Sequence, residues 1–374
     1  MKIAVIGAGC SGSYFGYLAA SAGFDVAIFD HSHPREKPCG GAVPSRNFEQ
    51  IKILKELDFP RRRVERARVA LQNKREVIVE FPEPIYVVDR ESFDGALLNK
   101  AVEAGARHVK EKVRDMSRRN GKWIIDNGDS FDVLIGADGV NSIVRTKLLG
   151  KQDPGDFGFS YHAKLDRELA DELVLVFYPG TIKGYGWIFP RPTGIACGVY
   201  FTHASQKDRA RKLFNELAAP LIGDSKELDA SPHPIPCIKR GRYSNIVAGR
   251  TWALIGDACM LADPHIGEGI FHALLSAELL FEAVKSGDLW QYQQTIYETV
   301  LPEVVTSSKL LNRLYSLPFL KLSVAFSARS ATAKNFVGDF LSRKLSYQEL
   351  NSMGLGPAMK ILRELFFTSK MPKK

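Results

Sequence analysis

The pattern of apolar and polar positions divides the chain into segments of different character. Residues 3–6 and 25–29 are apolar runs typical of buried strands, and the segment between them is rich in alanine and aromatic residues. This order predicts a strand, a glycine turn, a helix and a second strand, which together form a βαβ unit. The segments 133–145 and 251–280 each begin with another apolar strand, and the second continues into a long apolar helix.

Two other stretches show the alternation of apolar and polar residues that is typical of antiparallel strands. Residues 61–88 and 156–236 contain several such runs, and we expect them to form a sheet beside the α/β part of the molecule. After Asp288 the pattern becomes helical, with apolar runs interrupted by single basic residues. The chain is therefore predicted to have an α/β fold with an antiparallel sheet and C-terminal helices.

Composition narrows the class of protein. The chain has 374 residues, which exceeds the usual size of one domain. Its net charge of +9 favours anionic partners such as phosphates, acidic lipid surfaces or nucleic acid, without choosing among them. Its five cysteines form neither a CxxC pair nor a zinc spacing, so we expect a reducing compartment and no metal site. No leader segment and no apolar window long enough to span a bilayer is evident. We therefore expect a cytoplasmic monomer that reaches membranes only peripherally and does not bind nucleic acid.

The first turn carries a dinucleotide-binding pattern. Gly7, Gly9 and Gly12 form G-x-G-x-x-G between a strand and a helix, and Asp30 ends the next strand. Gly7 permits the tight turn, Gly9 lets the backbone approach a pyrophosphate, and Gly12 lets the helix pack closely on the strand. The helix N-terminus then offers free N–H groups to the phosphates. An acidic residue at position 30 favours FAD or NAD over NADP.

Three later segments resemble, in order, the other fingerprints of the flavoprotein hydroxylase superfamily, which includes p-hydroxybenzoate hydroxylase. They are VVDRESFDGALLNKAVEAGA (87–106), VLIGADGVNSIVR (133–145) and the segment 251–280 with its GD and glycine-rich turns. The resemblance implies an FAD-binding domain assembled from separated pieces. It assigns cofactor binding to Gly7, Gly9, Gly12, Asp30, Cys39, Gly40, Arg90, Asp138, Gly256, Asp257, Gly267 and Gly269.

The resemblance also implies domain boundaries. We expect a Rossmann-like FAD-binding domain, a substrate-binding sheet domain and a C-terminal helical region. Their respective residues are 1–60, 89–155 and 237–290; 61–88 and 156–236; and 291–374.

Two short motifs narrow the resemblance within this superfamily. KPCGG, with Cys39 at its centre, and GYGWIFP, with Tyr185 and Trp187, resemble the motifs of the geranylgeranyl reductase family of FAD-dependent oxidoreductases. The resemblance covers about residues 1–290 and thins out in the C-terminal helices. Relatives often have a third glycine where this chain has Ala42. It implies reduction of carbon–carbon double bonds in a prenyl lipid or polyprenyl quinone, with Cys39, Tyr185 and Trp187 as the catalytic residues.

A thiol has a chemical use in such a reaction. An isolated trisubstituted alkene cannot accept hydride alone, because the other carbon would become an unstabilised carbanion. A weak acid held in an apolar slot can deliver the proton, and burial keeps a thiol protonated. Aromatic rings beside it would bind the prenyl chain and stabilise positive charge. The alternatives are that Cys39 is a small packing residue and that the aromatic side chains belong to an ordinary core.

Other functions share the same FAD pattern. A flavin monooxygenase acting on an aromatic or polyketide substrate needs no Cys-Gly-Gly, and a flavin halogenase needs a catalytic lysine, for which Lys74 in a polar turn is a poor candidate. A non-enzymatic flavin-binding or membrane-surface protein is a third alternative. No second nucleotide fingerprint is present, so NAD(P)H must bind transiently or a small electron carrier must deliver the electrons. His265 would lie beside the flavin or in a solvent-facing loop.

The C-terminal helices suggest contact with membranes. Their apolar runs are interrupted by basic residues, and basic amphipathic segments bind acidic lipid surfaces. The basic residues concerned are Lys321, Arg329, Lys360 and Arg363.

Overall fold

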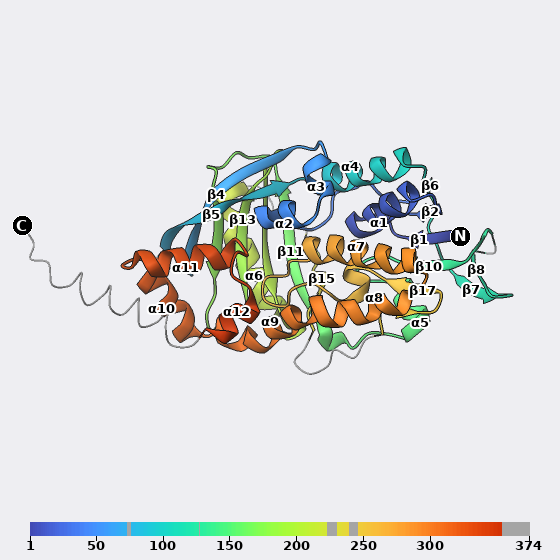
Figure 1. The fold of residues 1–374 in the computed structure, drawn as a ribbon. Helices are drawn as coiled ribbons and strands as arrows, with labels where there is room; N and C mark the ends of the chain where they lie inside the picture. Colours follow the sequence, from blue (N-terminus) through green and yellow to red (C-terminus); the bar gives the residue numbers. More distant parts are fainter. Residues whose placement is uncertain (73–75, 127, 223–229, 239–245, 354–374) are drawn as a thin grey trace, which may run out of the picture.

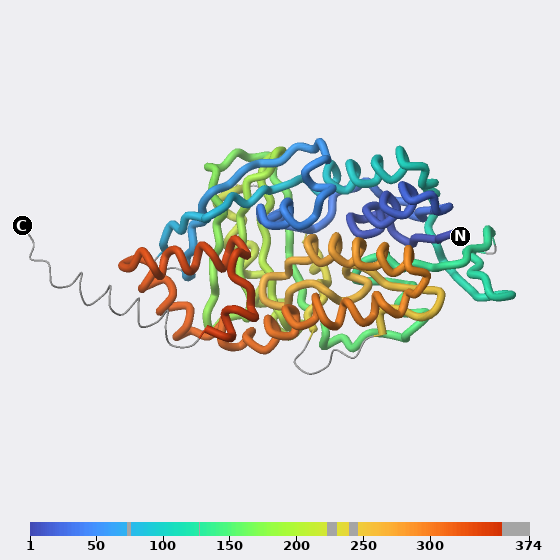
Figure 2. The backbone as a smooth tube through the Cα atoms, viewed as in Figure 1, coloured from blue at the N-terminus to red at the C-terminus, as the bar shows by residue number. Residues whose placement is uncertain are grey.

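Two large β-sheets and a group of C-terminal helices make up the protein. The computed structural model describes residues 1–72, 76–126, 128–222, 230–238 and 246–353. The two sheets lie side by side, and α10 and α11 lie at the end of the molecule remote from the N-terminus (Figure 1). The chain passes repeatedly from one sheet to the other, as the colours of the tube show (Figure 2). This architecture confirms the predicted fold class.

The first sheet has six strands in the order β16-β17-β10-β1-β2-β6. Its strands and helices are β1 (Lys2–Ile6), β2 (Asp25–Phe29), β6 (Arg107–Val109), β10 (Val133–Gly136), β16 (Ala248–Gly249), β17 (Trp252–Leu254), α1 (Cys10–Ser21), α4 (Arg90–Glu103) and α7 (Ile270–Ser286). Every neighbouring pair is parallel except β16 with β17. The central strands are buried, as their continuous apolar runs require, and α1 packs against α4 and α7.

The second sheet has eight strands in the order β15-β11-β14-β13-β12-β4-β5-β3. They are β3 (Ala42–Pro44), β4 (Arg61–Leu71), β5 (Glu76–Val88), β11 (Phe157–Leu165), β12 (Leu173–Phe177), β13 (Gly184–Pro190), β14 (Ile195–Phe201) and β15 (His233–Pro236). Because side chains alternate along a strand, Tyr185, Trp187 and Phe189 of β13 share one face of the sheet. The opposite face packs against α6 (Lys207–Ile222).

The C-terminal region is helical as far as it is described, as the sequence predicts. It consists of α8 (Leu289–Thr295), a π-helical turn (Ile296–Val300), α9 (Leu301–Leu314), α10 (Leu317–Ser327), α11 (Ala331–Leu341) and α12 (Tyr347–Ser352). Helices α10 and α11 pack against β4 and β5, so they cover part of the second sheet on the face that carries Tyr185.

Short elements complete the fold. They are the helices α2 (Ser45–Gln50), α3 (Ile53–Glu56) and α5 (Ile143–Leu149), the 3-10 turns Pro154–Asp156, Ala204–Gln206 and Gly256–Cys259, and a three-stranded sheet of β7 (Met116–Arg119), β8 (Lys122–Ile125) and β9 (Ser130–Phe131).

Three details differ from the sequence expectation. Residues 207–222 form α6, although the surrounding segment was expected to be a sheet. The second sheet is not wholly antiparallel, because β4 and β12 run parallel. Strand β3 lies within 1–60 but pairs with β5 of the second sheet. The parallel pair and the place of β3 depend on pairing between segments far apart in the chain, which local patterns do not specify, whereas α6 has its own helical spacing of buried residues, which the sequence interpretation overlooked. With the exception of β3, we propose the same domain boundaries as above.

Candidate functional site

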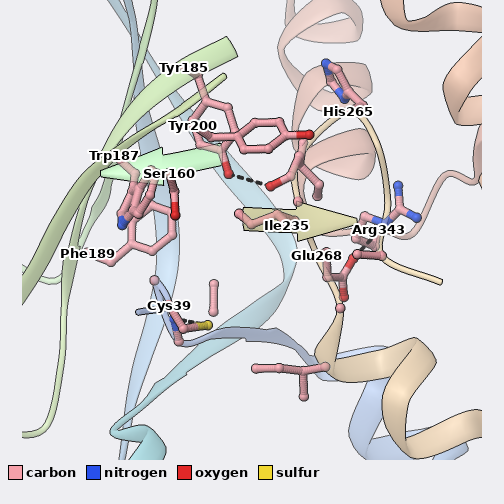
Figure 3. Close-up of a pocket in the computed structure, with 18 of the residues that line it drawn as sticks. Cys39, Ser160, Tyr185, Trp187, Phe189, Tyr200, Ile235, His265, Glu268 and Arg343 are labelled. Carbon is pink, nitrogen blue, oxygen red and sulfur yellow. Dashed lines mark hydrogen bonds and ion pairs between the residues drawn. The ribbon is translucent and has the colours of Figure 1, made fainter. Parts of the chain in front are cut away.

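A cavity of about 580 Å³ lies where the first sheet, the second sheet and the C-terminal helices meet. Figure 3 shows part of its wall, with Cys39 opposite the aromatic side chains of β13. The predicted site residues that line the cavity are Gly9, Cys39, Gly40, Arg90, Asp138, Tyr185, Trp187, Asp257, Gly267 and Gly269. The predicted residues that do not line it are Gly7, Gly12, Asp30 and Gly256.

The three glycines of the first turn have different surroundings. Gly7 has φ +106°, and a Cβ there would lie 2.4 Å from the Ala137 carbonyl oxygen. A Cβ at Gly12 would lie 2.0 Å from the Gly7 carbonyl oxygen. At Gly9 the nearest atom to such a Cβ would be His33 Nε2, at 3.8 Å. Gly7 and Gly12 are therefore required by packing, whereas Gly9 faces open space in the cavity.

Two helices begin at this end of the cavity without a capping side chain. Helix α1 starts after Gly9 and α7 after Gly269, and neither has an acidic residue in its first turn. Free N–H groups at a helix N-terminus attract anionic groups. The open space at Gly9 and these two termini fit the pyrophosphate of FAD and the negative charge that its ring would carry when reduced, and Arg35 and Lys37 also line the cavity.

The carboxylate of Asp30 accepts hydrogen bonds from neighbouring groups of the protein. Its Oδ2 accepts hydrogen bonds from the Ala8 backbone N–H (3.0 Å) and from His33 Nδ1 (2.8 Å), and its Oδ1 accepts from the Ser32 N–H (2.8 Å). Burial by itself would raise the pKa of Asp30, but the bonds from His33 and Ala8 hold it well below its ordinary value. Asp30 therefore fixes the glycine turn, and its predicted contact with a ribose stays a prediction.

Arg90 belongs to a buried network behind the cavity. Its Nε and Nη2 donate to the two carboxylate oxygens of Asp94 at 3.1 and 2.7 Å. His33 Nε2 lies 3.6 Å from Asp94, so the network continues through His33 to Asp30. Arg90 lines the cavity while its charge is already balanced by Asp94.

Asp138 has a local structural role at the cavity. Its carboxylate accepts hydrogen bonds from Ser142 Oγ (2.6 Å) and from the Ile143 backbone N–H (2.7 Å) at the start of α5. Burial raises its pKa despite these bonds. Its predicted part in cofactor binding stays a prediction.

The KPCGG loop packs directly against the GYGWIFP strand. A Cβ at Gly40 would lie 2.8 Å from Phe189 Cδ2 and 3.3 Å from Trp187 Nε1. Gly41 has φ +78°, and its carbonyl accepts from the Val88 N–H at 3.0 Å. Gly40 therefore allows the loop to approach the aromatic strand, and Gly41, where a Cβ would lie 2.3 Å from the Val88 carbonyl oxygen, allows it to approach the end of β5. The indole N–H of Trp187 is buried without a hydrogen-bond partner among the described residues.

Cys39 sits at the tip of this loop, half-buried and with a free thiol. Its Sγ accepts a hydrogen bond from the Gly41 N–H at 3.3 Å. His162 of β11 lies nearby, and burial together with Arg191 lowers the pKa of His162 to about 4, although a hydrogen bond with the Cys39 backbone acts in the opposite direction. The thiol thus lines the cavity beside aromatic side chains, with the charged Lys37 and Arg90 in the same wall, and its catalytic role stays a prediction.

Tyr185 does not offer a free hydroxyl to the cavity. Its O–H donates to the Ile266 carbonyl at 2.8 Å, while Tyr200 and Tyr315 donate to the carbonyls of Pro264 and His265. Three tyrosines from the second sheet and from the end of α9 therefore hold three successive carbonyls of the loop before α7. The ring of Tyr185 lines the cavity, and burial raises its pKa.

His265 is buried, so its placement in a solvent-facing loop is wrong. Its Nδ1 lies 2.9 Å from the hydroxyl of Tyr347, which donates to Asp263 at 2.7 Å. Burial lowers the pKa of His265 to about 4, although Asp263 acts in the opposite direction. Arg343 follows α11, lines the cavity and pairs with Glu268 at 3.2 Å. The dashed line between Glu268 and Arg343 in Figure 3 marks this ion pair.

The sequence interpretation missed several of these residues. Tyr200, Tyr315, Tyr347, Arg343 and His162 carry no motif, and they come together only through tertiary contacts. The only feature in the sequence that could have drawn attention to them is that their side chains are aromatic or charged.

The other part of the cavity is apolar. Strands β4, β5 and β12 and helices α10 and α11 contribute side chains such as Leu175, Phe177, Leu320, Val324 and Leu341. None of the residues that these five elements contribute to the cavity wall is charged. We call this part the apolar arm.

Some predicted residues lie outside the described part of the chain. They are Lys74, Lys360 and Arg363. Within the described ranges, no helix combines the length and the apolar character needed to cross a bilayer.

The chain is similar to several known proteins. Residues 5–58 match the NAD(P)-binding Rossmann-like domain family. Geranylgeranyl diphosphate reductase of Rhodobacter capsulatus is 29% identical over 76% of this chain and 75% of its own. Menaquinone reductase of Mycolicibacterium smegmatis is 28% identical over 88% of each chain.

A crystal structure shares the fold over almost the whole length. It is a geranylgeranyl bacteriochlorophyll reductase-like protein from Thermoplasma acidophilum, with a TM-score of 0.73, 19% identity and 98% of each chain covered. Together the relatives confirm the resemblance seen in the sequence motifs. The chain is an FAD-dependent oxidoreductase related to the geranylgeranyl reductases.

Proposed function

We propose that this protein reduces carbon–carbon double bonds in the prenyl chain of a geranylgeranyl-type lipid or a polyprenyl quinone. The observation that carries the proposal is the uncharged apolar arm. It belongs to the same cavity as the two uncapped helix N-termini, and Cys39 lines that cavity as well. An isoprenoid chain is apolar and unbranched except for methyl groups, so such an arm binds it by burial of surface. The relatives named above act on prenylated molecules, which supports the same substrate class.

The residues have distinct roles in this proposal. Gly9 and the N-termini of α1 and α7 hold FAD, which when bound and reduced supplies hydride to the alkene. Cys39 donates the proton to the other alkene carbon, and the rings of Trp187 and Tyr185 hold the chain and face positive charge that develops during protonation. The thiolate then regains a proton from solvent.

The electron donor is a separate part of the proposal. We infer that NAD(P)H visits the flavin transiently or that a small electron carrier reduces it, since the glycine turn at residues 7–12 is already assigned to FAD. The net charge of +9 suits either a phosphorylated nucleotide or an acidic carrier.

We also propose that α10 places the apolar arm at a membrane surface. Leu317 and Leu322 are 40% and 51% exposed, and Lys321 and Arg329 are exposed beside them. Leu320 of the same helix lines the cavity. A lipid would therefore have to pass only one short helix between an acidic bilayer surface and the apolar arm.

The test is anaerobic stopped-flow with Cys39→Ala. The variant should fold, bind FAD and accept electrons as the parent does, because Cys39 is a half-buried loop residue. Return of oxidised flavin on adding a geranylgeranyl lipid or a polyprenyl quinone should slow by about 10²–10⁴-fold, as for the loss of a general acid. Cys197→Ala is the control, since Cys197 is buried on the face of the sheet that packs against α6.

Two results would contradict the proposal. Equal rates for parent and Cys39→Ala would leave Cys39 with a packing role alone. A parent that reduces no prenyl lipid, yet consumes oxygen while hydroxylating an aromatic compound, would be a monooxygenase instead.

A further inference from the structure

A buried guanidinium lies behind the Cys39 loop. Arg191 directly follows β13, the strand of the GYGWIFP motif, and its side chain is 0% exposed. Its Nη2 lies 2.7 Å from Glu36 Oε1, and its Nε lies 2.8 Å from Asp89 Oδ1. Lys164 of β11 lies 3.5 Å from Asp89 and 3.9 Å from Glu36. Two cations and two anions therefore balance at this point.

The partners of Arg191 occupy informative places in the chain. Glu36 stands immediately before Lys37, the first residue of the KPCGG loop. Asp89 precedes Arg90 as the N-cap residue of α4, and its Oδ2 accepts hydrogen bonds from Thr193 N–H and Oγ1 at 3.1 and 2.8 Å. Arg191 thus connects the aromatic strand, the cysteine loop and the start of the helix that carries Arg90.

A planar guanidinium suits this connection better than an ammonium. Its Nη2 donates a directed hydrogen bond to Glu36, while the rest of the same rigid plane lies against Asp89 as an ion pair without a hydrogen bond from Nε. The ion pair between Arg191 and Glu36 fixes the start of the loop, and the contact of Gly40 with Trp187 and Phe189 fixes its other end. Between these two points the chain has few ways to move Cys39.

We propose that Arg191 is a positioning residue that, through Glu36, holds Cys39 at a fixed place beside Trp187. The inference rests on the proposed function for its catalytic consequence, whereas the placement of the thiol is testable without any substrate. Without the ion pair between Arg191 and Glu36, the loop samples positions in which Cys39 is more accessible to solvent and less well aligned with a bound alkene.

The test uses Glu36→Ala in the full chain loaded with FAD. This variant frees the loop while Arg191 keeps Asp89, which avoids leaving a buried guanidinium without a partner. Arg191→Lys keeps the charge beside Asp89 and loses the directed hydrogen bond of the guanidinium to Glu36. Arg68→Met is the matched control, because Arg68 of β4 pairs with Glu76 of β5 and with Glu172, which directly precedes β12, and none of these residues belongs to the loop.

The first readout is the rate at which iodoacetamide alkylates Cys39, followed by mass spectrometry. The other four cysteines are buried, so the signal reports the loop. Glu36→Ala should raise this rate by about 10-fold or more, since a charge-assisted hydrogen bond no longer opposes local opening. Arg191→Lys should give a smaller increase, and Arg68→Met should match the parent. The FAD content of all variants should be the same.

The second readout is flavin reoxidation by a prenyl lipid under anaerobic conditions. It should fall by about 10- to 100-fold in Glu36→Ala, the loss expected from a misplacement of about 1 Å. Unchanged alkylation in Glu36→Ala, or an equal increase in Arg68→Met, would overturn the positioning role. A parent that reduces no prenyl lipid would refute the proposed function, while the alkylation rates would still decide the role of Arg191.

Discussion

Replacing Gly9 should weaken FAD binding without impairing folding. The nearby Gly7 and Gly12 differ, because a side chain at either position would clash with the backbone. Gly9 has φ −68° and ψ 179°, a conformation open to any residue, and an added Cβ would approach only His33 Nε2 at 3.8 Å. The free energy of unfolding of the FAD-free protein should therefore change by less than about 1 kcal/mol in Gly9→Ala and Gly9→Val. In Gly12→Ala the new Cβ would overlap the Gly7 carbonyl oxygen at 2.0 Å, and the loss should be about 1–3 kcal/mol or more.

FAD affinity should show a different order. Valine at position 9 would fill the space in front of the α1 N-terminus, where backbone N–H groups would bond the pyrophosphate. A hydrogen bond to a charged group contributes about 1.5–3 kcal/mol. Losing two such bonds amounts to about 3–6 kcal/mol, which weakens binding by about 10²–10⁴-fold. Gly9→Ala, with one methyl group, should show a smaller loss.

The measurement combines urea unfolding of the FAD-free proteins with FAD titration followed by flavin fluorescence. The expected pattern is a stable Gly9→Val that binds FAD poorly and a destabilised Gly12→Ala. Gly9→Val with the FAD affinity of the parent would refute the placement of the pyrophosphate at this helix terminus. A Gly9→Val protein that fails to fold would contradict the open space seen around Gly9.

Three further predictions concern the second sheet, the buried histidine and α10. Gly198→Ala should displace the Trp187 ring and also lower the stability of the sheet, because the new Cβ would lie 2.3 Å from Trp187 Cζ2 and 2.4 Å from the Tyr161 carbonyl oxygen; the tryptophan fluorescence spectrum and lipid affinity should change together. Because burial lowers the pKa of His265 to about 4, its neutral form stabilises the folded state above pH about 6.5, and up to about 3 kcal/mol of that stability should be lost as the pH falls toward 4. His265→Asn should flatten the pH dependence of urea unfolding over this range, and an unchanged slope would contradict it. Leu322→Glu should reduce flotation with anionic liposomes at low salt, whereas Trp290→Glu on α8, a residue 52% exposed, should float like the parent; equal flotation of both variants would place the membrane contact elsewhere.

The sequence by itself determined the parts of the fold that depend on local patterns. The apolar runs 3–6 and 25–29 with their glycine turn gave β1, α1 and β2, because the period of burial and the backbone freedom of glycine are properties of a short segment. Alternation along GYGWIFP predicted a strand with Tyr185 and Trp187 on one face, and the structure has this arrangement. The motifs also indicated the flavin and the class of relatives.

Tertiary structure decided how these parts meet. No local pattern shows that Gly40 approaches Phe189, or that Arg191 reaches Glu36 across 155 residues. Both contacts follow from the packing of the loop against β13, which depends on the whole second sheet. The same reason explains why strand β3 joins that sheet, whereas α6 has a local helical period that the sequence interpretation overlooked.

Burial decided the state of the polar groups. Asp30 has the spacing of a ribose ligand, yet its carboxylate is occupied by Ala8 and His33, because the turn folds back onto it. His265 has its pKa lowered by helices that lie far along the chain. A sequence specifies which side chains are ionisable, whereas desolvation and neighbouring charges, which exist only in the folded molecule, determine their charge and the partners they have left to bind.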